Sequence, residues 1–112
     1  MYAAYVFERE GLLEIKTDRG FIHYKIENGL CLINDYYVLP EFRKQGHGYF
    51  LANQVFELAK EQGVKIVVCQ TDELANGYEL SKFTIENFGF DWYEKDGSLN
   101  FYRMGVSEWE RK

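Results

Sequence analysis

The chain has 112 residues, 46% of them hydrophobic and 18% aromatic, which is enough for one domain with one core and too few for two domains of ordinary size. Eighteen acidic and thirteen basic side chains give a formal net charge of −5, which opposes non-specific binding to nucleic acid. No apolar run approaches the roughly 18 residues that span a bilayer, and the first residues do not resemble an export leader. These features predict a single domain over residues 1–112, located in the cytoplasm, without a nucleic-acid or membrane partner. The negative charge suits a cationic substrate, or it serves only to keep a small domain soluble.

The first third of the chain reads as short strands. Turn signals separate apolar stretches at residues 18–20 and at Asn28-Gly29. Asn-Gly between two apolar runs predicts a tight hairpin, because both residues tolerate a positive φ. Pro40 ends the last of these strands, since proline has no N–H to donate to a sheet. The predicted strands span residues 2–8, 12–16, 21–27 and 30–38, and their order in the sheet stays open.

Helical spacing begins after residue 46. Leu51, Val55 and Ala59 recur at helical intervals, and Gly63 is well placed to end the helix. A β-branched run then predicts a buried central strand, and a second helix and a hairpin follow it. The order predicts a mixed α/β domain of the α+β kind, with a mostly antiparallel sheet and two main helices, in which the fourth and fifth strands run parallel because a helix joins them. These elements are predicted at residues 47–62 (helix), 64–69 (strand), 76–88 (helix), 90–93 and 99–104 (strands).

One loop is the strongest candidate for ligand binding. Residues 43–48, Arg-Lys-Gln-Gly-His-Gly, lie between a strand and an amphipathic helix. Backbone N–H groups can converge in such a loop, and the helix start adds partial positive charge, so the loop suits a pyrophosphate. Gly46 and Gly48 would let the backbone approach phosphate oxygens, while Lys44 and His47 could add charge or hydrogen bonds. A Walker loop and the dinucleotide fingerprint are excluded by the glycine spacing, and an ordinary helix start is the remaining alternative.

The loop and its flanks resemble a known family. Residues 37–48, Tyr-Val-Leu-Pro-Glu-Phe-Arg-Lys-Gln-Gly-His-Gly, resemble the most diagnostic motif of the GNAT superfamily of N-acetyltransferases, and residues 86–90, Glu-Asn-Phe-Gly-Phe, resemble its later helix end and Gly-Phe pair. The resemblance covers about residues 21–104. It implies a GNAT-like fold, acetyl-coenzyme A as cosubstrate, and a cleft between splayed fourth and fifth strands. By position, it implies that pantetheine is held by Tyr37, Val38 and Leu39, and pyrophosphate by Arg43, Lys44, Gln45, Gly46, His47 and Gly48.

The chain departs from the family pattern in two places. GNAT domains usually have a helix pair between the first two strands, and residues 8–11 leave no room for it here. The acceptor pocket is therefore expected to be open or completed by a second subunit. The tyrosine that usually protonates the leaving thiolate stands four residues before the Gly-Phe pair, where this chain has Ile85. Tyr78 is the candidate acid instead, and Asn76 is a candidate coenzyme-binding residue.

A general base for this chemistry takes one proton from an ammonium acceptor, directly or through water, so a carboxylate facing the cleft is expected. Asp35 is the first candidate, and Tyr36, on the opposite face of the same strand, is the second. The alternative for Asp35 is a polar residue near a strand bulge with no catalytic role.

The remaining reactive side chains favour structural roles. Cys31 and Cys69 each lie inside an apolar run, which is typical of buried reduced thiols, and no partner histidine is evident for Cys69 as a nucleophile. His23 and His47 do not make a metal site without spaced partners, so no metal is expected.

The sequence thus predicts transfer of an acetyl group from acetyl-coenzyme A to a primary amine by direct attack. The acceptor, a small molecule or a peptide amine, stays open. A coenzyme A-binding module with little or no catalytic activity is the rival prediction, motivated by Ile85 and the short N-terminal region. A homodimer is expected, because a domain without acceptor-side helices exposes sheet and cleft surface.

Overall fold

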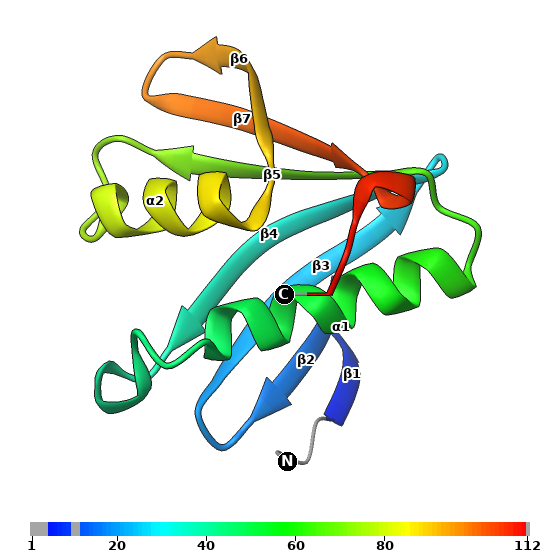
Figure 1. The fold of residues 1–112 in the computed structure, drawn as a ribbon, viewed down its shortest axis with the longest axis horizontal. Coiled ribbons are helices and arrows are strands. Elements are labelled where there is room, and N and C mark those ends of the chain that lie inside the picture. The colour runs from blue at the N-terminus through cyan, green and yellow to red at the C-terminus, as the bar shows by residue number, and fades with distance from the viewer. Residues whose placement is uncertain (1–4, 10–11, 112) are drawn as a thin grey trace.

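The structure is a computed structural model that describes residues 5–9 and 12–111. The described residues form one seven-stranded sheet and two α-helices, with two short 3-10 turns (Figure 1). The helices are α1 (His47–Glu61) and α2 (Tyr78–Phe88). The 3-10 turns are η1 (Pro40–Phe42) and η2 (Val106–Glu108). The strands are β1 (Tyr5–Arg9), β2 (Leu12–Thr17), β3 (Gly20–Glu27), β4 (Leu30–Val38), β5 (Ile66–Asp72), β6 (Asp91–Asp96) and β7 (Leu99–Gly105).

The sheet has the strand order β1-β2-β3-β4-β5-β7-β6, which the sequence pattern had left open. Every neighbouring pair is antiparallel except β4 and β5, which are parallel as predicted. These two strands pair only near their starts, at Leu30↔Ile66, Cys31↔Val67 and Leu32↔Val68. Beyond this point they diverge, as Figure 1 shows. The rest of β4 therefore has an edge that no strand of the described chain covers.

The hairpin between β3 and β4 follows from its two turn residues. Asn28 has a φ of 52° and Gly29 a φ of 79°, the pair of positive values that a tight two-residue hairpin requires. The predicted hairpin is confirmed. Within it the register shifts between His23, which faces Asp35, and Tyr24, which faces Ile33. Asn34 is thus the extra residue of a β-bulge, and the bulge turns the end of β4 away from β5.

Both helices pack on one face of the sheet. Phe56 of α1 contacts Phe88 of α2 with ring centroids 5.5 Å apart, and α1 crosses in front of β2 and β3 in Figure 1. The chain end joins the same layer, because Trp109 stacks on Phe56 and donates a hydrogen bond from Nε1 to Oδ1 of Asn53 at 3.0 Å. The fully buried core side chains include Ile15, Tyr24, Cys31, Leu51, Val55, Phe56, Ala59, Val67 and Tyr102.

Element boundaries differ from the predicted ones by a few residues. Strand β5 begins two residues later and ends three residues later than predicted, and α2 begins at Tyr78 rather than at residue 76. The helix cannot begin earlier because Gly77 has a φ of 79°, outside the helical region. Only residues 10 and 11 separate β1 from β2, so the expected absence of a helix pair at this point is confirmed. The predicted strand residues 2–4 lie outside the described part of the chain.

Candidate active site

The loop after β4 reverses the chain tightly to begin α1. Lys44 has a φ of 62° and Gly46 a φ of 82°, so two residues within three adopt the left-handed region that favours glycine. Gly46 is the N-cap of α1. A side chain at Gly46 would meet no atom within 4 Å, which means that backbone conformation, and not space, selects glycine at this position.

The start of α1 presents backbone donors to the loop. Its first intrahelical N–H bond runs from Phe50 to the carbonyl of Gly46 at 3.0 Å, so the N–H groups of Gly48 and Tyr49 come before the hydrogen-bonded ladder. Among the described residues no side chain caps this helix end, and its first turn contains no acidic residue. Such a helix start carries a partial positive charge and suits an anion.

Arg43 links the loop to the end of β4. Its Nε donates a hydrogen bond to the carbonyl of Val38 at 2.9 Å, and its guanidinium lies over the ring of Tyr37, 5.3 Å from the centroid. These contacts hold a permanent positive charge beside the helix start.

The imidazole of His47 points into the protein. The residue is 4% exposed, its Nε2 lies 2.7 Å from Oγ1 of Thr17, and its ring stacks on Phe50. Burial lowers the pKa of His47, and the nearby Arg19 lowers it further against the opposing effect of Asp18. The ring is therefore neutral at pH 7, and it fastens the start of α1 to β2.

The turn between β2 and β3 contacts the segment that follows β4. Leu39 donates its N–H to the carbonyl of Arg19 at 2.8 Å, and the Arg19 guanidinium lies 4.4 Å from the ring centroid of Phe42. A Cβ at Gly20 would overlap the carbonyl oxygen of Tyr37. Glycine at this position is what lets the turn pack directly against the end of β4.

Two adjoining cavities lie along the divergent strands. The outer cavity has a volume of about 610 Å³ and lies between the loop, the start of α1 and the near face of α2. The inner cavity, of about 380 Å³, lies between β4 and β5. The two form one continuous cleft, since seven residues line both: Tyr36, Tyr37, Gly48, Tyr49, Asn76, Ser81 and Thr84.

The two cavities carry opposite charge. Arg43 and Lys44 are the charged side chains that line the outer cavity, with His47 neutral beside them. Asp35 of β4 and Asp72 of β5 are the charged side chains that line the inner one. The cleft therefore offers a cationic end to an anionic ligand and an acidic end to a cationic one.

Sequence comparison identifies the family. Residues 6–80, about two thirds of the chain, match the acetyltransferase (GNAT) family. The chain belongs to the GNAT acetyltransferase family. The resemblance of the loop motif and the expected GNAT fold are thereby confirmed. Among curated proteins, no sequence matches this chain significantly.

Solved GNAT-type structures share the fold. A PaiA N-acetyltransferase from Thermoplasma acidophilum in complex with coenzyme A has a TM-score of 0.74 and 20% identity, over 84% of this chain and 59% of that one. A GNAT-family acetyltransferase from Staphylococcus aureus has a TM-score of 0.71 and 16% identity, over 85% and 66%. An IAA acetyltransferase from Bacillus cereus has a TM-score of 0.73 and 13% identity, over 86% and 79%. The present chain thus spans less than two thirds of the Thermoplasma protein, and the likeness shows the fold.

Most of the predicted GNAT site residues meet in the cleft. Tyr36, Tyr37, Gly48 and Asn76 line both cavities. Asp35 and Tyr78 line the inner cavity. Lining the outer cavity are Val38, Arg43, Lys44, Gly46 and His47.

Leu39 and Gln45 line neither cavity. The Leu39 N–H is bonded to Arg19, and the amide of Gln45 donates from Nε2 to the carbonyl of Glu41 at 3.1 Å. Both residues belong to the loop, and in this structure they shape it without facing the cleft.

The position of the usual GNAT acid is apolar and buried. Ile85 is 7% exposed and contributes to the core beside the inner cavity. Cys69 lines the same cavity, but burial raises the pKa of its thiol far above the ordinary value. Burial also raises the pKa of Cys31 to about 12. Neither thiol is a nucleophile at neutral pH, in agreement with the structural role predicted for both.

Several lining residues escaped the sequence analysis. Asp72 at the end of β5 and four residues of α2 line the cleft. The α2 residues are Leu80, Ser81, Phe83 and Thr84, whose helical spacing, three and four residues apart, would have indicated one shared face. Asp72 carried no signal in the sequence, because only the tertiary structure brings it to the same cavity as Asp35.

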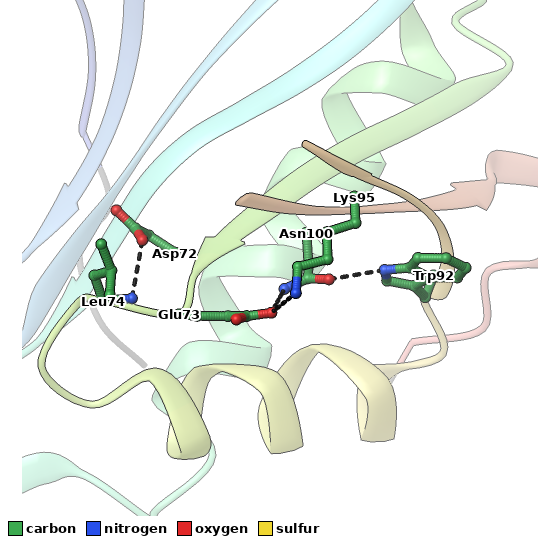
Figure 2. Close-up of polar contacts among 6 residues, drawn as sticks. All are labelled: Asp72, Glu73, Leu74, Trp92, Lys95 and Asn100. Carbon is green, nitrogen blue, oxygen red and sulfur yellow. Dashed lines mark hydrogen bonds and ion pairs between the residues drawn. The ribbon is translucent and has the colours of Figure 1, made fainter. Parts of the chain in front are cut away.

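The segment that precedes α2 is held by a partly buried polar cluster (Figure 2). Asn100 of β7 donates to Oε1 of Glu73 at 2.8 Å and accepts from Nε1 of Trp92 at 3.0 Å, while Lys95 lies 2.9 Å from the same Glu73 oxygen. The Asn100 hydrogen bond, followed by that of Lys95, lowers the pKa of Glu73. This cluster ties the segment before α2, and with it Asn76, to the β6–β7 hairpin.

Neither a metal centre nor a membrane span is found in the described residues. Within residues 5–9 and 12–111, His, Cys, Asp and Glu side chains form no group of three or more that could hold a metal ion. In the same ranges no helix combines the length and the apolar character that crossing a bilayer requires.

Proposed function

We propose that this protein transfers an acetyl group from acetyl-coenzyme A to a primary amine. The observation that carries the proposal is the continuous cleft with a cationic outer end and an acidic inner end, in a chain of the GNAT family. An anionic coenzyme and a cationic acceptor would enter such a cleft from its two ends.

The outer end suits the diphosphate of the coenzyme. The N–H groups of Gly48 and Tyr49 and the side chains of Arg43 and Lys44 supply donors and positive charge in one place. Gly48 has no side chain between Tyr36 and Thr84, the nearest groups to a Cβ there at 4.0 and 3.9 Å, and this leaves the cleft open beside the helix start.

The uncovered edge of β4 suits the pantetheine arm. Leu39 bonds toward the β3 side through Arg19, and backbone groups alternate in direction along a strand. The groups of Val38 therefore point to the edge that β5 leaves open. The Val38 carbonyl accepts from Arg43, and its N–H is in position to bond the arm or to polarise a thioester oxygen.

The inner end suits an ammonium group. Asp35 and Asp72 approach it from opposite strands, and a positive charge there would gain from both carboxylates. The ammonium has to lose one proton before its nitrogen can attack, and Asp35 of β4, the first candidate base, would take it directly or through water. Tyr36 is the second candidate for this role.

The reaction then needs no covalent enzyme intermediate. The amine lone pair forms a bond to the thioester carbon, the carbon–sulfur bond breaks, and the electron pair leaves with sulfur. Tyr78, which lines the inner cavity, is the candidate that donates a proton to the thiolate. The first proton of the ammonium passes to the base before the attack. The nitrogen loses a second proton as the amide forms, and this proton returns through solvent to the Tyr78 phenolate. Holding both reactants in one cleft supplies much of the rate enhancement.

Release of free coenzyme A thiol tests the proposal. The protein is mixed with acetyl-coenzyme A and a panel of mono-, di- and polyamines and lysine peptides, and thiol is measured against an enzyme-free control. We expect amine-dependent release that Asp35→Asn reduces at least tenfold. Binding of acetyl-coenzyme A without release for any amine would refute the transferase proposal.

One observation favours a second function, a coenzyme A-binding module without catalysis. Ile85 is buried where GNAT enzymes usually have their acid tyrosine. In that case calorimetry detects acetyl-coenzyme A binding while the amine panel gives no turnover, and Tyr78→Phe changes nothing in either measurement.

Two further proposals concern assembly and location. We propose a homodimer in the cytoplasm, in which a second copy covers the sheet face opposite the helices, where the partly exposed side chains of Phe21, His23 and Tyr37 lie in one stacked row. Sedimentation that gives only a 13.3 kDa species at tens of micromolar would contradict the dimer.

A further inference from the structure

Two large apolar side chains of α2 stand exposed at the mouth of the outer cavity. Phe83 is 64% exposed and Leu80 is 42% exposed, and both line this cavity. They lie three residues apart, so they are neighbours on one face of the helix. A phenyl ring left largely in water at the wall of a cavity has one face available for a flat apolar ligand group.

The position of this pair relative to the cleft separates it from the other α2 residues. Ser81 and Thr84, on the same helix, line both cavities, whereas Leu80 and Phe83 line only the outer one. An extended ligand that runs from the start of α1 into the inner cavity would pass Ser81 and Thr84 and would not pass Phe83. Phe83 and Leu80 therefore line the part of the cleft that lies away from the inner cavity.

The chemistry of coenzyme A supplies a matching group. Its diphosphate joins the pantetheine arm on one side to adenosine on the other, so an arm that points to the inner cavity leaves adenine on the outer side. An aromatic side chain stacks on a nucleobase, and its replacement by alanine measurably weakens binding of the base.

We propose that Phe83, with Leu80 beside it, is the platform on which the adenine ring of coenzyme A stacks. This inference rests on the proposed function, because it presumes that the diphosphate lies at the start of α1. It assigns a binding role to the face of α2 on which these two apolar side chains are exposed.

The test is calorimetry with two ligands and four proteins. Acetyl-coenzyme A contains adenine, and acetyl-4′-phosphopantetheine lacks it. We expect Phe83→Ala to raise the dissociation constant of acetyl-coenzyme A about tenfold and to leave that of acetyl-4′-phosphopantetheine unchanged. Phe83→Trp, which keeps an aromatic face, restores the affinity for acetyl-coenzyme A.

Leu74→Ala is the matched control. Leu74 is 83% exposed and lines neither cavity, so its removal deletes a surface apolar group of similar kind without touching the cleft. The control should bind both ligands as the wild type does. All variants change exposed side chains, and circular dichroism checks that each is folded.

The outcomes separate this inference from the proposed function. Equal affinity of wild type and Phe83→Ala for acetyl-coenzyme A would overturn the adenine platform alone. An equal loss for both ligands would also overturn it, since the ring would then contact pantetheine. Failure of the wild type to bind acetyl-coenzyme A would overturn the proposed function and, with it, the platform.

Discussion

The two helices of this protein begin in the same way and at the same cavity, yet only one start is suited to an anion. Each follows a left-handed glycine, Gly46 with a φ of 82° before α1 and Gly77 with a φ of 79° before α2. In the described chain neither start has a side-chain cap, and both glycines line the outer cavity. Backbone geometry alone therefore does not distinguish them.

Charge distinguishes them. The first turn of α1 contains no acidic residue, and Arg43 and Lys44 lie just before it. The first turn of α2 contains Glu79, whose carboxylate offsets the partial positive charge of that helix end. The comparison teaches that an anion site at a helix start depends on which charges the chain places around the backbone donors.

The supports of the two starts also differ. The start of α1 is fastened through the interior, by the buried pair His47 and Thr17 and by Gly20 against β4. The segment before α2 is held by the cluster around Glu73, in which Asn100 is buried while Lys95 and Glu73 form a partly exposed ion pair (Figure 2). Buried contacts constrain geometry more firmly than solvated ion pairs do, so we expect α1 to be the fixed wall of the cleft and α2 the adjustable one.

The largest expected effect comes from filling the space beside the α1 start. Gly48→Val should raise the dissociation constant of acetyl-coenzyme A about 100-fold, equivalent to about 2.7 kcal/mol, because the side chain would occupy the cleft between Tyr36 and Thr84. The fold should tolerate the change, since a Cβ at Gly48 meets its nearest neighbours only at 3.9 and 4.0 Å. Calorimetry and circular dichroism measure the two effects. Wild-type affinity in the variant would mean that the loop is an ordinary helix start.

The second prediction concerns the close packing of Gly20 against the end of β4. Gly20→Ala should lower the free energy of unfolding by about 2 kcal/mol, because its Cβ would overlap the Tyr37 carbonyl. Urea denaturation measures the loss. Gly29→Ala is the control: Gly29 has a φ of 79° with no atom near its Cβ position, so that variant should lose only the conformational part, about 1 kcal/mol. Equal losses would show that the close approach at Gly20 is unimportant.

The third effect tests the charge difference directly. Lys44→Ala should weaken acetyl-coenzyme A binding about fivefold at low ionic strength, and the difference should shrink as salt is added, because exposed charges are screened. Glu79→Ala, in the first turn of α2, should change the affinity less than about twofold. If both substitutions act alike in a salt titration, the two helix starts are not electrostatically distinct.

The smallest effect is a pH dependence of stability. Burial holds the pKa of His47 below its ordinary value of about 6.5, so the unfolded chain binds a proton more readily than the folded one. The free energy of unfolding should therefore fall as the pH drops below about 6.5. Arg19 adds to the shift and Asp18 opposes it.

Thermal melts between pH 7.5 and 5 measure this dependence in the wild type and in His47→Gln, in which the slope should be reduced. His23→Gln is the control, because His23 lies on the other face of the sheet beside Glu14. An unchanged slope in His47→Gln would contradict the assignment.

The sequence predicted local structure wherever a residue type has a distinctive backbone preference. Asn28-Gly29 marked a hairpin and Gly63 the end of α1, because these residues accept a positive φ, and Pro40 marked the end of a strand, because it has no N–H to donate. Helical spacing likewise identified Leu51, Val55 and Ala59, all fully buried. The loop motif led to the family and to half of the residues that line the outer cavity.

Tertiary structure alone decided what lies opposite these residues. No local pattern pairs Asp35 with Asp72 across the cleft, or turns the imidazole of His47 from the loop to Thr17. These placements depend on the bulge at Asn34 and on where β4 and β5 part, and such long-range pairings are set by the packing of the whole sheet. The sequence by itself thus determined the turns, the helices and the family motif, whereas the charge separation along the cleft arose only from the fold, because it joins side chains that are distant along the chain.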